Sequence, residues 1–227
     1  MKMPHRHRPK GLEIIYEDRD LIVINKDAGL LTMSTPRDEQ RTAQYLLTDY
    51  LRKGAARSRL RAYTVHRLDR ETSGLLIFAK TEAVQQWLKD HWKETEKEYL
   101  AIVHGQLKEK TGTLSSYLAE NEAQFVYSTS QTKGKLSETQ YSVIRENKLF
   151  SELKINLLTG RKNQIRVQFA ELGHPVVGDI KYGLKEKKFE RMALHARSIA
   201  FNHPHSGKRM SFEAPVPKFF TRLMKPS

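Results

Sequence analysis

The amino-acid sequence contains no cysteine among its 227 residues. This absence excludes a disulfide framework, a thiolate nucleophile and a zinc site with cysteine ligands. No apolar run approaches the roughly 20 residues that a membrane-spanning helix needs, and the N-terminus lacks the apolar core of a signal peptide. We therefore predict a soluble protein of the reducing cytoplasm that has no membrane partner.

Acidic residues are scarce relative to basic ones. The chain has 26 Asp and Glu against 40 Lys and Arg, which gives a formal net charge of +14. An excess of this size favours a polyanionic partner and carries no information about the fold. Nucleic acid is the leading interpretation, and a basic surface that only keeps the protein in solution is the alternative.

The first ten residues lack acidic side chains altogether and include two prolines. Such a segment buries little apolar area, so we predict a basic flexible arm over residues 1–10. The remaining residues 11–227 fit a single catalytic domain, because α+β enzymes of roughly 200 to 250 residues commonly fold as one unit. His5 and His7 have no surroundings that would orient them, so we predict no metal site in the arm.

The residues best suited to catalysis lie between His66 and Lys80, where an ionisable cluster runs directly into the apolar run Leu75–Ala79. This run has the length and composition of a buried strand. Asp69 lies between arginines, whose charge stabilises its ionised form and offsets partial desolvation. Asp69 is therefore the best candidate for a catalytic nucleophile or base. A structural ion pair at the strand end is the alternative.

Positive charge is most concentrated from Arg52 to Arg70. A solvated loop is the usual interpretation of such a run. Because this segment leads directly into the Asp69 motif, we favour a contact with the backbone of RNA.

Hydrophobic periodicity predicts the main secondary-structure elements. Two β-rich runs form a hairpin between Glu13 and Lys26, and a helix over residues 39–53 is expected to end at Gly54. Thr81 is expected to cap a second helix, which packs Trp87 in the core. Antiparallel strands are expected over residues 97–105, 112–118, 124–130, 138–145 and 150–158.

A last long helix is expected after Thr159 and Gly160, with Ile165, Phe169 and Leu172 on one face. Further on, the spacing of His195, His203 and His205 is compatible with a metal cluster. The intervening proline and the missing carboxylate partner argue against one, so we predict structural histidines and no metal.

The motif around Asp69 reads His-Arg-Leu-Asp-x-x-Thr-Ser-Gly-Leu-Leu-x-x-Ala-Lys, and it resembles the signature of the RluA-type pseudouridine synthases. Four further segments resemble the same family in the same order: Asn25–Leu31, Lys97–Gly105, Leu157–Gly183 and Met192–Pro217. The resemblance implies an α+β fold with a central mixed, mainly antiparallel sheet, flanking helices and an RNA cleft. Some relatives carry an additional N-terminal RNA-binding module of the S4 type. Because ten basic residues are too few to form one, we expect the catalytic domain itself to select the RNA.

The resemblance implies a reaction as well. Family members isomerise uridine in ribosomal or transfer RNA to pseudouridine without a cofactor, and the target base must be flipped out of its stack. By resemblance, Asp69 is the catalytic carboxylate, Arg166 pairs with it, and Tyr99 lies against the uracil. Arg67 is expected to fill the gap left in the RNA stack, and Ile165 to form an apolar wall of the pocket.

Three more residues of the same motifs, His66, Arg161 and Gln164, are expected to contact the substrate. We expect no metal and no cofactor, and a monomer is the default for a basic RNA enzyme of this size.

This chain departs from the family pattern at four places. Asp27 replaces a proline, Met33-Ser34 stands where a histidine is expected, and Asn163 and Gln168 replace histidines. Both amides keep the ability to hydrogen-bond but do not titrate near neutral pH. The alternative hypothesis is therefore a catalytically degenerate relative that binds or refolds RNA.

Overall fold

The computed structural model describes residues 9–33, 40–53, 55, 57–184 and 189–225. Most of the predicted arm, and Gly54, lie outside the described residues. The chain folds into two compact units: unit 1 comprises residues 1–95 and 198–214, and unit 2 comprises residues 96–197 and 215–227. Each unit is thus built from two separate segments. The single catalytic domain expected over residues 11–227 stays a prediction.

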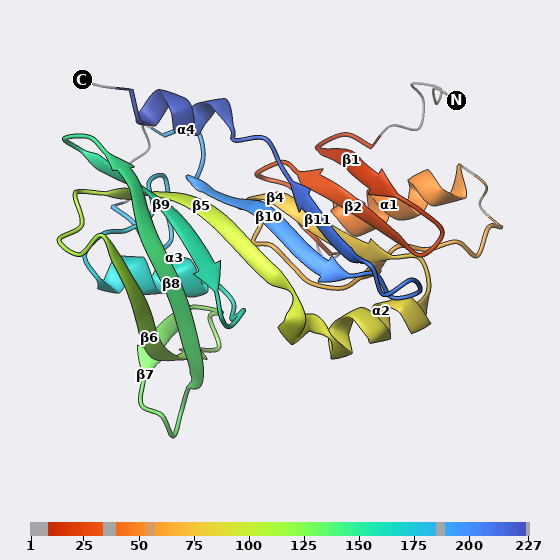
Figure 1. Cartoon of the computed structure of the whole chain (residues 1–227), viewed down its shortest axis with the longest axis horizontal. Helices are drawn as coiled ribbons and strands as arrows, with labels where there is room; N and C mark the ends of the chain where they lie inside the picture. Colours follow the sequence, from red (N-terminus) through yellow and green to blue (C-terminus); the bar gives the residue numbers. More distant parts are fainter. Residues whose placement is uncertain (1–8, 34–39, 54, 56, 185–188, 226–227) are drawn as a thin grey trace. The chain divides into compact units, whose positions relative to one another are not determined.

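Unit 1 is organised around the apolar strand that follows the Asp69 motif, β4 (Ser73–Ala79), in which all seven residues are buried. The predicted hairpin is confirmed as β1 (Leu12–Glu17) and β2 (Leu21–Lys26), which pair antiparallel and place Ile14 opposite Ile24. β2 continues the sheet by pairing antiparallel with β4. These strands are the red and yellow arrows of Figure 1.

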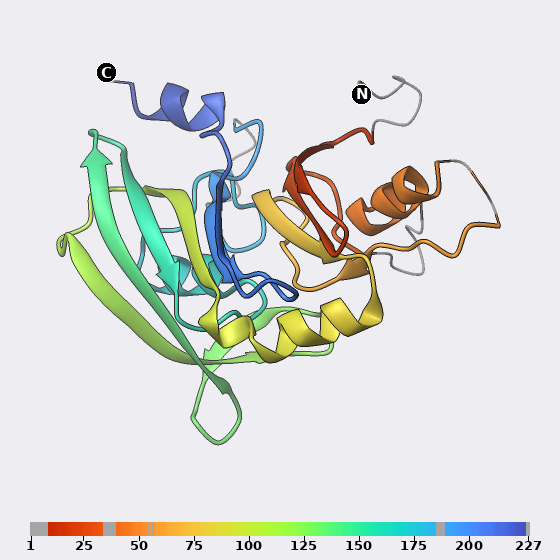
Figure 2. The ribbon, with the colours of Figure 1, turned by 45° about the vertical axis from the view of Figure 1, so that its right-hand side comes forward.

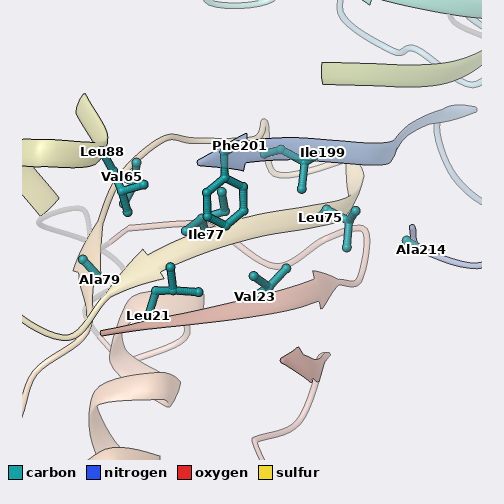
Figure 3. Close-up of a cluster of buried hydrophobic side chains, with 10 residues drawn as sticks. All are labelled: Leu21, Val23, Val65, Leu75, Ile77, Ala79, Leu88, Ile199, Phe201 and Ala214. Carbon is teal, nitrogen blue, oxygen red and sulfur yellow. The ribbon is translucent and has the colours of Figure 1, made fainter. Parts of the chain in front are cut away.

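Two further strands follow on the other side of β4. β10 (Leu194–Asn202) is its neighbour in the sheet, and β11 (Arg209–Glu213) pairs antiparallel with β10. Figure 3 shows β4 and the unit 1 part of β10 running in the same direction, opposite to β2. The short β3 (Tyr63–Thr64) pairs antiparallel with β4. The predicted mixed, mainly antiparallel sheet is therefore confirmed.

One face of this sheet carries an apolar core. Its members are alternate residues of neighbouring strands, which point to the same side because side chains alternate along a strand. Figure 3 shows Leu21 and Val23 of β2 beside Leu75 and Ile77 of β4. Phe201 from β10 completes the layer. Burial of such a set supplies most of the free energy that holds a sheet together.

Helices α1 (Ala43–Arg52) and α2 (Glu82–Asp90) belong to unit 1. The predicted cap of α2 is confirmed, since the Thr81 hydroxyl accepts a hydrogen bond from the Val84 amide at 3.2 Å. α1 lies within the predicted range but is shorter: it begins at Ala43, after the N-cap Thr42, and ends at Arg52, where Lys53 adopts the left-handed conformation with φ 50°. Trp87 is partly buried against the core, as predicted.

Unit 2 contains five antiparallel strands in the order β5-β9-β8-β6-β7. The strands are β5 (Glu96–His104), β6 (Thr111–Glu120), β7 (Val126–Thr129), β8 (Lys135–Glu146) and β9 (Phe150–Leu157). All five lie where the sequence predicts strands. They form the green part of Figure 2.

Helix α3 (Gln164–Glu171) packs against β6, β7 and β8, and it brings the polar residues Gln164, Arg166 and Gln168 into the interior of unit 2. Ile165 and Phe169 are buried, as predicted. Leu172 is not buried. It follows the last residue of α3, Glu171, as the C-terminal cap, and it is 44% exposed. A short helix, α4 (Lys218–Leu223), buries Phe219 and Phe220 in the same unit.

His203 ties two turns of unit 1 together. Its Nε2 donates to the Asp18 carboxylate at 2.9 Å, while its Nδ1 accepts from the amides of His205 and Ser206. Asp18, Asp20 and His203 are grouped closely enough to hold a metal ion. Because the Asp18 oxygens already accept four hydrogen bonds, the grouping is explained by the turns that it fixes. No helix in the described part of the chain is long and apolar enough to cross a membrane.

Candidate active site

Asp69 lies in the loop of unit 1 that joins β3 to β4, and it is half-buried. Its backbone carbonyl accepts a hydrogen bond from the Thr72 amide at 3.1 Å, which closes a turn just before the strand. The carboxylate is therefore carried by a tight turn at the end of the most deeply buried strand of the unit. Such a position restricts the backbone without covering the side chain.

The residue before Asp69 is fixed by a buried threonine. The Thr32 hydroxyl donates to the Leu68 carbonyl at 2.9 Å and lies 3.2 Å from the Leu68 amide, from which it accepts. One hydroxyl thus uses both its donor and an acceptor position on the same peptide unit. Thr32 is only 3% exposed, so water does not compete for these bonds.

The residue after Asp69 is fixed by a buried lysine. The Lys26 ammonium donates to the carbonyls of Asp27 at 2.9 Å, Leu30 at 2.7 Å and Arg70 at 3.1 Å. The Gly29 amide donates to the same Arg70 carbonyl at 2.8 Å. Lys26 is fully buried at the end of β2, so its three donors are satisfied by backbone oxygens. The loop therefore holds Asp69 between two neighbours that are anchored by buried hydrogen bonds.

His66 and Arg67 lie in the same loop. The His66 Nε2 accepts a hydrogen bond from the Ile77 amide of β4 at 3.1 Å, and its ring lies 4.4 Å from the Trp92 ring. His66 thus supplies the acceptor that a neighbouring strand would otherwise provide, just beyond the end of β3. Arg67 is exposed, which leaves its guanidinium accessible to solvent.

In unit 2, Arg166 is held by the carboxylate of Asp179. Arg166 Nε and Nη2 donate to the two Asp179 oxygens at 2.7 and 2.9 Å, a bidentate pair. Asn163 accepts from Arg166 Nη1 at 2.8 Å. Both members of the pair are buried, with side-chain exposures of 8% and 0%. Their geometry therefore fixes the plane of the guanidinium.

Asp179 also organises the loop that follows it. Its Oδ1 accepts from the amides of Lys181 and Tyr182 at 2.9 and 3.0 Å, and the Tyr182 ring lies 5.1 Å from Arg166 Cζ. Burial opposes ionisation of Asp179, yet the hydrogen bond and charge of Arg166 hold its pKa below the usual range. The preceding Gly178 is required, since a Cβ there would lie 2.2 Å from the Arg191 carbonyl oxygen.

The two departures in α3 have different consequences. Asn163 adopts φ 54°, a conformation that asparagine tolerates, and its Nδ2 donates to the Tyr182 hydroxyl at 3.1 Å. Gln168 Nε2 donates to the Ser137 carbonyl at 2.9 Å and to the Ser116 hydroxyl at 3.0 Å, while its Oε1 has no partner among the described residues. Asn163 thus takes part in the Arg166 cluster, and Gln168 braces α3 against the sheet.

Tyr99 lies on β5, opposite Ile155 of β9, and is 9% exposed. Lys97 lies two residues earlier, and therefore on the same face of the strand. Burial lowers the pKa of Lys97. Ile165, at the start of α3, is 4% exposed.

Gln164 and Arg161 shape the loop before α3. Gln164 donates to the Glu138 carbonyl and to Thr139 Oγ1, and its Oε1 accepts from Thr159 Oγ1 and the Arg161 amide. All four hydrogen-bonding positions of the amide are thus used within unit 2, and contact with a substrate requires the exchange of one of them. Arg161 is exposed, and its Nε lies 3.3 Å from the Leu136 carbonyl oxygen, to which it donates.

The predicted site residues therefore form two groups. His66, Arg67 and Asp69 share one loop of unit 1, whereas Tyr99, Arg161, Gln164, Ile165 and Arg166 belong to unit 2. The residues that hold these groups in place, Lys26, Thr32 and Asp179, were not predicted from the sequence. A charged residue inside or beside an apolar run was the available signal for Lys26 and Asp179; Thr32 gave none.

The family model for RNA pseudouridylate synthase matches residues 20–171 of the chain. The chain belongs to this family. Family members are isomerases that act on RNA, so the predicted enzyme class and the predicted relationship to pseudouridine synthases are confirmed.

Individual relatives agree with the assignment to the pseudouridine synthases. The chain is 37% identical over 221 residues to a protein of Mycoplasma genitalium described as an uncharacterized RNA pseudouridine synthase, covering 93% of this chain and 69% of the relative. It is 33% identical over 230 residues to ribosomal large subunit pseudouridine synthase D of Escherichia coli, covering 94% and 70%. The structure of human RNA pseudouridylate synthase domain containing 1 matches with a TM-score of 0.74 and 27% identity, over 94% of this chain and 86% of that one. The pseudouridine-synthase fold is thus confirmed.

Proposed function

We propose that this pseudouridine synthase isomerises uridine in structured RNA and that Asp69 is its catalytic carboxylate. The observation that carries the proposal is the Asp69 loop, in which Leu68 and Arg70 are both anchored by buried hydrogen bonds while Asp69 stays half-buried. A catalytic carboxylate needs a fixed backbone and an accessible side chain together.

The chemistry is redox-neutral and consumes no water. The bond between uracil N1 and the ribose C1′ breaks, the base turns, and a bond forms between C5 and C1′, while the hydrogen at C5 is lost as a proton and N1 gains one. A carboxylate serves either by covalent attack or by removing a sugar proton, and both routes return it unchanged. No cofactor enters the balance.

The remaining residues have roles in substrate positioning. The target uridine leaves its stack, at a cost of about a few kcal/mol that binding offsets. Arg67, exposed in the Asp69 loop, fills the vacated position, and His66 beside it supports the loop. Tyr99 and Ile165 contact the uracil.

Arg166 orients the catalytic carboxylate. The Asp179 pair and Asn163 support this role because they fix the guanidinium plane. Arg161 and Gln164 complete the substrate contacts from the loop before α3.

Ribosomal RNA is the first substrate to test, because the 33% identical Escherichia coli relative is named for the ribosomal large subunit. Transfer RNA is the second. We propose a monomer that acts on these RNAs in the cytoplasm.

A tritium-release assay tests the proposal directly. RNA labelled with tritium at uracil C5 loses the label only when C5 forms its new bond. We expect release by the wild type and a loss of about 10³-fold or more in Asp69→Asn. Asp49→Asn, an exposed aspartate on α1, is the matched control and is expected to act like the wild type.

Near-native release by Asp69→Asn would contradict the assigned role of Asp69. Salt-sensitive RNA binding without release by the wild type, on both ribosomal and transfer RNA, would instead favour the catalytically degenerate RNA-binding protein.

A further inference from the structure

Next to the Asp69 loop, unit 1 contains a pocket of about 590 Å³. This volume falls within the range of roughly 300–1,000 Å³ that small-molecule sites occupy. The lining comes from the end of the N-terminal arm, the turn after β2, the start of α1 and the Asp69 loop. Its residues are Lys10, Gly11, Asp27, Ala28, Gly29, Leu30, Leu31, Gln40, Arg41, Leu46 and Arg70.

Three cationic side chains line this pocket, and two of them have no hydrogen-bond or ion-pair partner among the described residues. Within the described part of the chain, neither Lys10 nor Arg41 makes a side-chain hydrogen bond or ion pair, and both are exposed. Arg70 is the exception, since its Nε donates to the Gly29 carbonyl at 3.0 Å and lies 3.8 Å from the Glu71 carboxylate. The cluster therefore offers two free positive groups and one fixed one to an anion.

The positive charge at the pocket comes from these side chains and not from free amides at the start of α1. The first amides of this helix are already used: Ala43 donates to the Leu31 carbonyl, Gln44 to the Thr32 carbonyl and Tyr45 to the Thr42 hydroxyl. An anion in the pocket is therefore bound by Lys10 and Arg41.

The remainder of the lining identifies the kind of anion. Leu30, Leu31 and Leu46 are half-buried and give the pocket an apolar side, which suits the face of a ring. Asp27 is exposed and its carboxylate has no partner among the described residues. A lone carboxylate repels a small free anion but accepts hydrogen bonds from the edge of a nucleobase. The pocket thus has cations that suit a phosphate, an apolar side that suits the face of a ring, and a carboxylate that suits the hydrogen-bond donors of a base edge.

We propose that this pocket is a subsite for a second nucleotide of the RNA substrate, distinct from the uridine that reacts. Lys10 and Arg41 bind its phosphate, the three leucines lie against its base, and Asp27 accepts from the base edge. Arg70 links the subsite to catalysis, because it directly follows Asp69 and bonds to Gly29 on the pocket wall. The inference rests on the proposed function, since it assigns the pocket to the same RNA.

Equilibrium binding of a fluorescent single-stranded hexaribonucleotide of mixed sequence tests the subsite, with the full chain at 50 to 200 mM salt. Arg41→Ala is expected to weaken binding about tenfold. It should also reduce the slope of log affinity against log salt by about 0.7, the value for one phosphate contact on single-stranded nucleic acid. The matched control is Arg19→Ala, an exposed arginine in the β1–β2 turn that lines no part of the pocket.

A second variant, Leu46→Trp, fills the apolar side without removing a cation. It should weaken binding and leave the salt slope unchanged, provided that its thermal midpoint matches the wild type. Should this variant unfold, the comparison of Arg41→Ala with Arg19→Ala still decides. Inorganic phosphate at millimolar concentration should compete poorly, and effective competition would overturn the nucleotide assignment.

The subsite is wrong if Arg41→Ala and Arg19→Ala bind the hexaribonucleotide equally well. The tritium-release assay separates this result from failure of the proposed function. Release by the wild type with equal binding by the two arginine variants rejects only the subsite. Weakened binding by Arg41→Ala without release by the wild type rejects only the proposed catalysis.

Discussion

Asp69 in unit 1 and Arg166 in unit 2 are positioned in opposite ways. Around Asp69 the structure fixes the backbone, through the Thr32 bonds to Leu68 and the Lys26 bond to Arg70. Arg166 is instead fixed through its own side chain, by Asp179 and Asn163. The backbone bonds fix where the main chain of Asp69 lies, whereas the side-chain bonds fix the plane of the Arg166 guanidinium. The difference shows that the two units hold their predicted site residues by different kinds of contact.

The largest effect is expected when the side-chain anchor of Arg166 is removed. Asp179→Ala leaves the buried Arg166 charge without its bidentate partner and should lower the free energy of unfolding by about 3–5 kcal/mol. Denaturant unfolding measures the loss. Glu122→Ala, an exposed acid of the same unit, should change stability by less than about 0.5 kcal/mol. A loss of under about 1 kcal/mol for Asp179→Ala would show that Arg166 is held by other means.

A smaller effect is expected when the backbone anchor beside Asp69 is removed. Thr32→Val removes the buried hydroxyl that serves both polar groups of Leu68, at a cost of about 2 kcal/mol. Thr64→Val is a matched control, because Thr64 is also buried in unit 1 but its hydroxyl has no hydrogen-bond partner among the described residues. That substitution should be neutral or stabilising. Equal stability of the two valine variants would contradict the anchoring role of Thr32.

A still smaller effect is expected when Arg166 loses Asn163, its uncharged partner, and keeps Asp179. Asn163→Gly keeps a residue that tolerates φ 54° but removes the bonds to Arg166 and Tyr182, so we expect a loss of about 1–2 kcal/mol in unfolding free energy. Tritium release should fall as well, since Nη1 of Arg166 loses its partner. A stable variant with wild-type release would make Asn163 dispensable for positioning.

The smallest effect is expected in acid, where the pH dependence of stability tests the Asp179–Arg166 pair. The folded pKa of Asp179 lies below its unfolded value of about 3.9, so the folded state binds fewer protons in acid. The stabilisation is complete above pH about 4 and is lost as the pH falls through the folded pKa, with a slope below about 1.4 kcal/mol per pH unit. Urea unfolding at pH 5, 4 and 3 should show a shallower decline for Asp179→Asn. Parallel declines for this variant and the wild type would assign the acid sensitivity elsewhere, for example to Asp18, whose pKa is also lowered.

The sequence by itself determined the elements and the motifs. Alternation along β5 and the apolar run of β4 predicted these strands because side-chain periodicity is a local property of the chain. The same local information located the Asp69 motif and the family. It did not predict the end of α1, where Lys53 adopts a conformation usually left to glycine. Nor did it predict the exposure of Leu172, since α3 stops one residue earlier.

Only the tertiary structure decided which groups hold the site. Lys26 meets Arg70 across 44 residues and Thr32 meets Leu68 across 36, so nothing in either local pattern specifies the partner. Asp179 lies within a recognisable motif, but its bidentate bond to Arg166 exists only because the loop folds back onto α3. Reactive residues carry a chemical signature in the sequence. The anchors around them use ordinary side chains, and their partners follow from long-range packing alone.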